Sequence, residues 1–233
     1  MDEKRYRLLV RTAIALTIAW VAWTLYDSGD GASKPGAHEL AAAGRYLEDG
    51  AFEKALAAFS KVYEQDQENI GALRGQAQAH MRLGLQQSIE AEQIKLNTQD
   101  DTSRAAQLRR SSNNHLQTAL SLYDEAIQRE TINGISQTNR LAIGVAHANR
   151  GILKDQLADY QGALDDYNLA LKLAPEVKEG PGFLTRFMRN QPEKPPSIAD
   201  RARYLETELA KPVEQRLMRL PDEDAKQQAY RLD

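Results

Sequence analysis

The side chains best suited to metal or acid–base chemistry are few and scattered along this chain. Cysteine is absent, and none of the four histidines has a second histidine three or four residues away. A transition-metal site needs several imidazole, thiolate or carboxylate ligands that converge on one ion. We therefore expect no metal site and a structural role for each histidine. The four are His38, His80, His115 and His147.

Two adjacent carboxylate pairs could serve acid–base catalysis or calcium binding. Asp100-Asp101 lies in a polar stretch that is typical of a turn, and Asp165-Asp166 lies in a predicted helix, where it is expected to face solvent. The sequence contains no phosphate-binding loop, nucleophile elbow or EF-hand loop. We therefore predict that the protein is not an enzyme and binds no cofactor.

Charge gives no sign of a nucleic-acid partner, because the net charge is -3 and no clustered basic face is evident. Basic residues do become frequent near the C-terminus, but acidic residues between them nearly neutralise the segment. A solvated face is the simpler interpretation, and a docking surface for an acidic partner or anionic headgroups is the alternative. These residues are Arg186, Arg189, Lys194, Arg201, Arg203, Arg216 and Arg219.

An apolar stretch at the N-terminus predicts a transmembrane helix over residues 8–26. At 1.5 Å per residue this helix would be roughly 28 Å long, close to the hydrocarbon thickness of a bilayer. Its single charge lies within one turn of the start and could reach the headgroups, and aromatic residues gather near the far end. The expected interface residues are Arg7, Arg11, Trp20, Trp23 and Tyr26.

A cleaved signal peptide is the main alternative to this anchor, and a buried core helix is a second one. No small-residue cleavage site follows the apolar run closely, which favours the anchor. Basic residues precede the run, whereas Asp27 and Asp30 follow it. The positive-inside rule then places residues 1–7 in the cytoplasm and the rest of the chain across the membrane. In a Gram-negative cell this arrangement is an inner-membrane protein with a periplasmic domain.

Residues 27–36 are predicted to form a flexible linker, since they are rich in Gly and Ser and lack an apolar period. Beyond the linker, Ala, Leu, Gln, Glu and Arg dominate, which predicts an all-α fold. The clearest pattern spans residues 159–175, where aromatic and small residues alternate at fixed steps before a proline. Its residues are Tyr160, Ala163, Tyr167, Ala170 and Pro175.

This pattern resembles the second helix of a tetratricopeptide (TPR) repeat, a 34-residue helix–turn–helix unit. In that phase Ala158 occupies the place of the turn glycine. A first unit in the same phase has helices at about 37–49 and 52–66, with Gly50 at the turn. Its matching residues are Tyr46, Gly50, Phe52, Ala55, Phe59 and Val62.

The second unit is interrupted by a 30-residue insertion, residues 85–114. Its first helix matches at Leu73, Ala77, His80 and Gly84, and the partner helix matches only later, at Ala119, Tyr123 and Ala126. Either both helices continue as an extended antiparallel hairpin that turns near residues 98–102, or the insertion is a disordered loop. A hairpin would have a thin apolar seam of Ile89, Ile94, Leu96, Ala105, Ala106 and Leu108.

The third unit completes a TPR-like domain over residues 37–175, and residues 176–233 are expected to form a C-terminal helical cap. A connecting loop at 131–137 precedes its first helix, which is predicted to begin near Thr138. Ser197 to Asp200 resembles a capping box that opens a helix to about Ala210, with shorter helical pieces after Pro212 and Pro221. The cap is expected to pack on the last repeat through Phe183, Phe187, Ile198, Tyr204 and Leu205.

The resemblance implies a groove lined by the first helix of each repeat. By phase, the wall comprises Leu40, Gly44, Leu47, Arg74, Gln78, Met81, Ala148, Ile152 and Asp155. The family's two-carboxylate clamp is absent, because only Arg74 and Gln78 resemble it. A mixed groove of this kind suits an extended or helical peptide. The alternative is that these positions pack against the cap.

Together these features predict a membrane-anchored adaptor or scaffold that binds other proteins and supports assembly of an envelope or membrane complex. A permanent structural subunit of a larger membrane complex is the alternative. TPR arrays serve many unrelated assemblies, so the resemblance does not identify the partner.

Overall fold

The computed structural model describes residues 16–17, 36–97, 102–132, 134–179 and 197–220. The chain comprises two compact units, residues 1–38 and 39–233. In the first unit Leu16 and Thr17 are helical. The rest of the predicted transmembrane helix, its five interface residues and nearly all of the predicted linker lie outside the described residues. Within the described ranges, no helix is long and apolar enough to cross a membrane.

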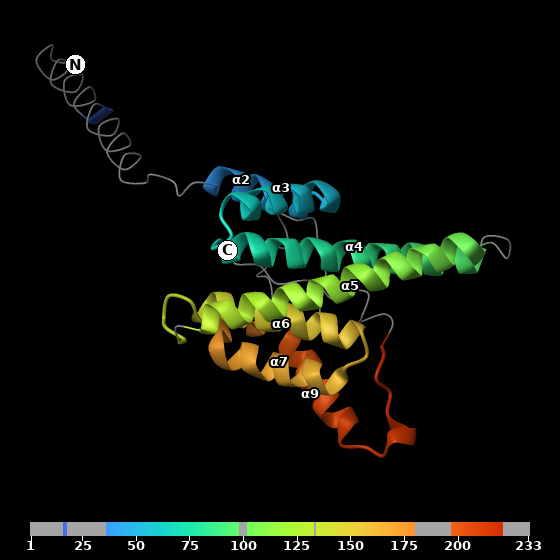
Figure 1. The fold of residues 1–233 in the computed structure, drawn as a ribbon. Coiled ribbons are helices and arrows are strands. Elements are labelled where there is room, and N and C mark those ends of the chain that lie inside the picture. The colour runs from blue at the N-terminus through green and yellow to red at the C-terminus, as the bar shows by residue number, and fades with distance from the viewer. Residues whose placement is uncertain (1–15, 18–35, 98–101, 133, 180–196, 221–233) are drawn as a thin grey trace, which may run out of the picture. The chain divides into compact units, whose positions relative to one another are not determined.

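All regular structure in the described residues is helical, with no strand, so the prediction of an all-α fold is confirmed. Two short 3-10 helices, η1 (Pro175–Glu179) and η2 (Val213–Gln215), accompany the α-helices that Figure 1 labels. The α-helices are α2 (Ala37–Glu48), α3 (Phe52–Gln65), α4 (Ile70–Asn97), α5 (Thr102–Thr131), α6 (Arg140–Gln156), α7 (Tyr160–Leu173) and α9 (Ile198–Leu209).

The turns that join α2 to α3 and α6 to α7 have the same construction. Gly50 and Ala158 both adopt left-handed backbone, with φ of 74° and 65°. The N–H of the next residue then donates to the carbonyl five residues back, from Ala51 to Tyr46 and from Asp159 to Lys154, both at 2.9 Å. These are Schellman motifs, which end one helix and redirect the chain into the next. Glycine accepts this backbone easily, whereas alanine is strained in it.

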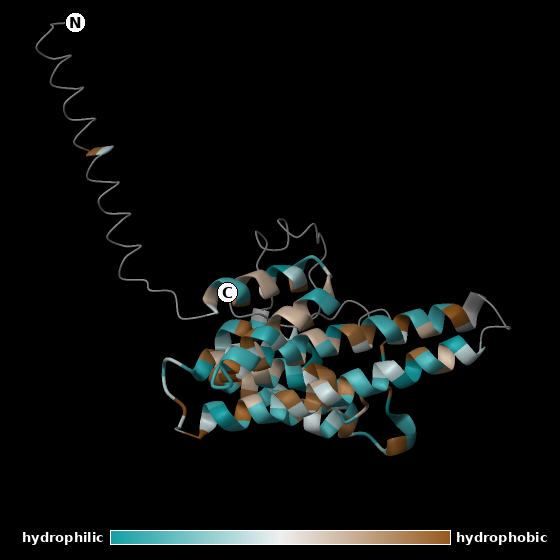
Figure 2. Ribbon diagram, turned by 45° about the horizontal axis from the view of Figure 1, so that its top comes forward, coloured by the Kyte–Doolittle hydropathy of each residue, from teal (hydrophilic) through white to brown (hydrophobic). Residues whose placement is uncertain are grey.

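Helices α4 and α5 form a long antiparallel hairpin, with 28 and 30 residues respectively. Both helices continue through the predicted insertion, as one of the two alternatives expects, while the turning residues 98–101 lie outside the described ranges. Figures 1 and 2 both show the two helices extending past the other described helices. We call residues 85–97 and 102–114 the overhang.

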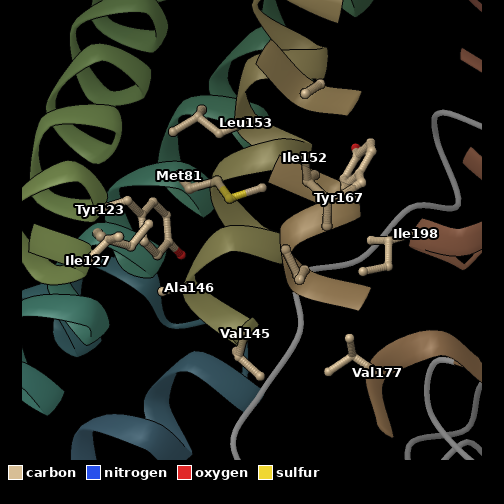
Figure 3. Close-up of a cluster of buried hydrophobic side chains, with 14 of the residues drawn as sticks. Met81, Tyr123, Ile127, Val145, Ala146, Ile152, Leu153, Tyr167, Val177 and Ile198 are labelled. Carbon is tan, nitrogen blue, oxygen red and sulfur yellow. The ribbon is translucent and has the colours of Figure 1, made fainter. Parts of the chain in front are cut away.

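The interior consists of two apolar cores that share α4. The smaller core joins α2, α3 and α4 through Ala43, Phe59 and Ala79. The larger core comprises side chains of α4, α5, α6, α7, η1 and α9. Figure 3 shows part of it, including Met81, Tyr123 and Tyr167. Helix α4 therefore connects the first helix pair to the rest of the described array.

Helix α9 closes the larger core. Its N-terminus has the predicted capping box, in which the Ser197 hydroxyl accepts from the Asp200 N–H and the Asp200 carboxylate accepts from the Ser197 N–H. Ile198 and Leu205 are buried in the core, as expected, and Tyr204 is half-buried. Phe183 and Phe187, the other predicted packing residues, lie outside the described residues.

Candidate protein-binding surface

The groove positions predicted on α2 remain partly open to solvent. Leu40 and Leu47 are half-buried and pack against the smaller core. At Gly44, a Cβ atom would meet nothing within 4 Å, so this side of α2 has free space. These three positions therefore keep part of their surface open to solvent.

The groove positions on α4 differ in exposure along the helix. The Arg74 guanidinium pairs with the Glu130 carboxylate of α5, and burial lowers the Arg74 pKa. Gln78 is half-buried. Met81 is only 1% exposed and belongs to the larger core, where Figure 3 shows its side chain. Only the first part of α4 therefore continues the surface that begins on α2.

The groove positions on α6 are all buried. Ala148 and Ile152 lie in the larger core, and Asp155 is 1% exposed. The Arg201 guanidinium of α9 donates to both Asp155 carboxylate oxygens, at 2.7 and 2.8 Å. Asp155 therefore packs against the cap, as the alternative expects, whereas Ala148 and Ile152 are buried in the larger core, and none of the three lines an open groove.

The overhang is the other large surface that the described residues leave accessible. The side chains buried along it are small: Ala91, Ala105 and Ser112. Exposed ion pairs tie its two arms together, from Arg104 to Glu90 at 2.9 Å and from Arg109 to Glu92 at 3.1 Å. Such exposed pairs contribute little to stability, and the arms present a largely polar surface.

The predicted apolar seam of the overhang is partly wrong. The Ile89 side chain is 59% exposed, whereas Ala91, two residues further on, is fully buried. Ala105 is buried as expected, and Ile94, Ala106 and Leu108 are half-buried. The Leu96 side chain lies outside the described ranges. Alanine at the seam lets the two helices approach closely, which leaves little room for a branched side chain.

The base of the overhang is tightly packed. A Cβ atom on Gly84 would lie 2.7 Å from a Leu116 methyl group and 3.0 Å from the Ser112 carbonyl oxygen. The Ser112 hydroxyl donates to the Gly84 carbonyl at 2.7 Å. Helices α4 and α5 therefore cross in contact at this point, and the overhang begins beyond it.

The expectation that Asp166 faces solvent is wrong. Asp165 is exposed, but Asp166 is 1% exposed and accepts hydrogen bonds from His147, Arg150 and Lys154 at 2.6–2.8 Å. Burial alone would raise the Asp166 pKa, but these hydrogen bonds outweigh it and hold the pKa well below its usual range. The side chain is therefore an anion that joins α7 to α6.

Two of the scattered histidines meet across the hairpin. His80 Nδ1 and His115 Nδ1 lie 2.8 Å apart, and the ring centroids are separated by 5.0 Å. At that distance one nitrogen donates a proton that the other accepts, which requires at least one neutral ring. Burial lowers the pKa of both rings. The alignment of α4 against α5 places these two histidines together, and the sequence alone does not give that alignment.

The basic residues near the C-terminus are divided between helix α9 and the segment after it. Arg201, Arg216 and Arg219 donate hydrogen bonds to groups of the cap or of α6, so they hold the cap in place. Arg203 is exposed and pairs with Asp200. Arg186, Arg189 and Lys194 lie outside the described residues.

Among the described residues, no group of three or more His, Asp or Glu side chains is arranged to hold a metal ion. No protein-family model, curated protein or solved structure matches the chain. Function must therefore be inferred from the chain's own residues and geometry.

Proposed function

We propose that the chain is a membrane-anchored, TPR-like adaptor or scaffold that binds other proteins and supports assembly of an envelope or membrane complex. The three helix pairs, with equivalent Schellman turns at Gly50 and Ala158, support the repeat interpretation. The apolar run at residues 8–26 and the charges that flank it support the anchor and its orientation.

The overhang is the observation that carries the proposal. Helices of 28 and 30 residues extend past neighbours of 12 to 17 residues, and the extra turns bury mainly alanine. A fold that needed these turns for its own stability would bury large apolar side chains along them. The exposed Ile89 side chain instead offers an apolar contact within a polar surface, an arrangement common in protein interfaces.

The anchor would make weak contacts at this surface effective. A domain tethered to a membrane meets other proteins of that membrane at a raised effective concentration. Partners with modest affinity could then associate reversibly.

Site-specific photocrosslinking in intact membranes tests the proposal. A photoreactive amino acid at Ile89 should give a discrete adduct, whose protein is then identified by mass spectrometry. Leu169 on α7 is a matched control, because it is also apolar and 43% exposed but lies outside the overhang. Equal adducts from both positions, or none from Ile89, would contradict the proposal.

Native mass measurement after mild detergent extraction separates an adaptor from a permanent structural subunit. An adaptor should run largely alone, with a small fraction bound to the crosslinked protein. A permanent subunit should run entirely within one complex of fixed composition.

A further inference from the structure

After α9 the chain turns back through η2 and ends its described part as an extended segment, residues 216–220. We call this segment the strap. It has no regular secondary structure, yet α9 side chains bind its backbone and its own Arg219 side chain binds the end of α6. These contacts indicate specific recognition of the segment.

One face of α9 recognises the strap backbone. The Glu208 carboxylate accepts from the Leu217 N–H at 2.8 Å, and the Tyr204 hydroxyl donates to the Leu217 carbonyl. Arg201 donates to the Met218 carbonyl at 2.8 Å. These three α9 residues are spaced three and four positions apart and therefore share a face of the helix. Hydrogen bonds to backbone groups do not depend on which side chains the segment carries.

The recognising side chains are held in place by groups outside the strap. Asp155 of α6 binds the Arg201 guanidinium through both oxygens and also accepts from the buried Tyr167 hydroxyl at 3.2 Å. The Arg201 guanidinium lies 5.3 Å from the centre of the Tyr204 ring. The donors on α9 would therefore keep their positions if the strap left. Preorganised groups of this kind bind a segment at a reduced entropic cost.

The strap side chains contribute in a simple pattern. Met218 packs against the larger core, whereas Leu217 is 58% exposed. Arg216 donates to the Leu209 carbonyl at the end of α9, and Arg219 donates to the Gln156 carbonyl at the end of α6, at 2.9 and 2.8 Å. The pattern is a basic residue, any residue, a half-buried apolar residue and a second basic residue.

We propose that this face of α9 and the end of α6 form a binding site for an extended peptide, and that the strap occupies the site in cis. The partner is a protein segment with the same pattern, which displaces the strap. This inference rests on the proposed function as a protein-binding adaptor and assigns it a second surface, distinct from the overhang. Recognition through backbone groups with one apolar pocket is a general mode of peptide binding.

Occupation in cis should lower the apparent association constant of a partner, which becomes the intrinsic constant multiplied by the fraction of chains whose strap is released. Leu217→Pro would release the strap without altering the site. Proline has no N–H to donate to Glu208, and Arg216 already has φ of -77° and ψ of 126°, a conformation that readily precedes proline. Leu217→Ala is the matched control, because it keeps the N–H.

Fluorescence anisotropy with the full chain and a labelled peptide of residues 213–220 tests the proposal. The L217P chain should bind the peptide at least about tenfold more tightly than the wild-type and L217A chains. Adding Tyr204→Phe to L217P should weaken binding again by about fivefold, since one hydrogen bond to the peptide is lost. A peptide with aspartate at the Met218 position should not bind.

The proposal is overturned if L217P keeps the helix content of the wild type and binds the peptide no more tightly. If L217P itself fails to fold, Arg219→Ala releases the strap from the α6 side and should give the same gain. Neither variant touches the overhang, so crosslinking at Ile89 should be unchanged. Loss of the peptide gain with intact crosslinking would therefore reject this site alone, and the reverse result would reject the overhang.

Discussion

The overhang and the region formed by α6, α7 and α9 are both built from packed helices, but different residues lie between those helices. In the overhang, alanine separates the helices and the ion pairs are exposed. In the α6–α7–α9 region, Tyr167, Ile152 and Leu205 fill the interior, and the carboxylates of Asp155 and Asp166 are buried and fully engaged.

The difference indicates that one region stabilises the fold, whereas the other provides an accessible surface. Buried apolar side chains contribute most of the free energy of folding, and buried charges fix the helices that carry them in one arrangement. Exposed charge pairs contribute little but keep a surface soluble and free to exchange partners. The α6–α7–α9 region therefore contributes most to the stability of the fold. The overhang can change its contacts without unfolding the protein.

The largest expected effect tests the buried charges of the α6–α7–α9 region. Asp155→Ala removes the partner of Arg201 and leaves that guanidinium buried without its carboxylate. We expect a loss of about 3–5 kcal/mol in the free energy of unfolding, measured by urea titration. Asp165→Ala, on the exposed side of α7, should change it by less than about 0.5 kcal/mol. Equal losses in the free energy of unfolding from the two variants would contradict the special role of the buried charges.

A second experiment uses pH to test the same region. The pKa of Asp166 is lowered in the folded protein, so its stabilising effect is present above the unfolded pKa of about 4 and is lost as pH falls further. Asp166→Asn should cost about 2–3 kcal/mol at pH 7. The difference from wild type should shrink steadily below about pH 4 in urea titrations. A cost that stays constant with pH would show that the charge is unimportant.

A third, smaller effect concerns the two Schellman turns. Ala158→Gly should stabilise the chain by about 1 kcal/mol, because alanine is strained at φ of 65°. Gly50→Ala should destabilise it by a similar amount, since φ there is 74°. Thermal unfolding of both variants gives the comparison. A destabilising effect of Ala158→Gly would indicate that packing of the alanine side chain fixes the turn between α6 and α7.

The smallest expected effect lies in the overhang. Replacing Glu90 and Glu92 together by alanine removes both exposed ion pairs between the arms, yet should cost less than about 1 kcal/mol. Hydrogen exchange should be faster in residues 85–97 than in α6, in the wild type as in the variant. A loss comparable with that of Asp155→Ala would mean that the overhang also supports the fold.

Local patterns predicted much of this fold. The helix pairs, the turn at Gly50, the turn position of Ala158 and the capping box at Ser197 all depend on residues close together in sequence. Steric limits on φ, helix periodicity and capping hydrogen bonds act over such short distances. The structure places these features within a few residues of where the sequence indicates them.

The errors arise where residues distant in sequence meet. Asp166 is buried because His147 and Arg150, on the previous helix, face it. Ile89 is exposed because the register of the hairpin turns it outward, and the same register brings His80 to His115. The groove positions on α6 are closed because the larger core buries Ala148 and Ile152, and Arg201 of α9 binds Asp155. No local sequence pattern specifies such contacts, which are visible only in the folded structure.

The crossing of α4 and α5 at Gly84 has a mechanical consequence. With no space between the helices at that point, the overhang cannot slide or flatten there, and each arm extends for about 20 Å at 1.5 Å per residue. A partner bound to the overhang would apply its force at a distance from this crossing, which adjoins Leu116 of the larger core. Load on the hairpin is thus delivered to the larger core.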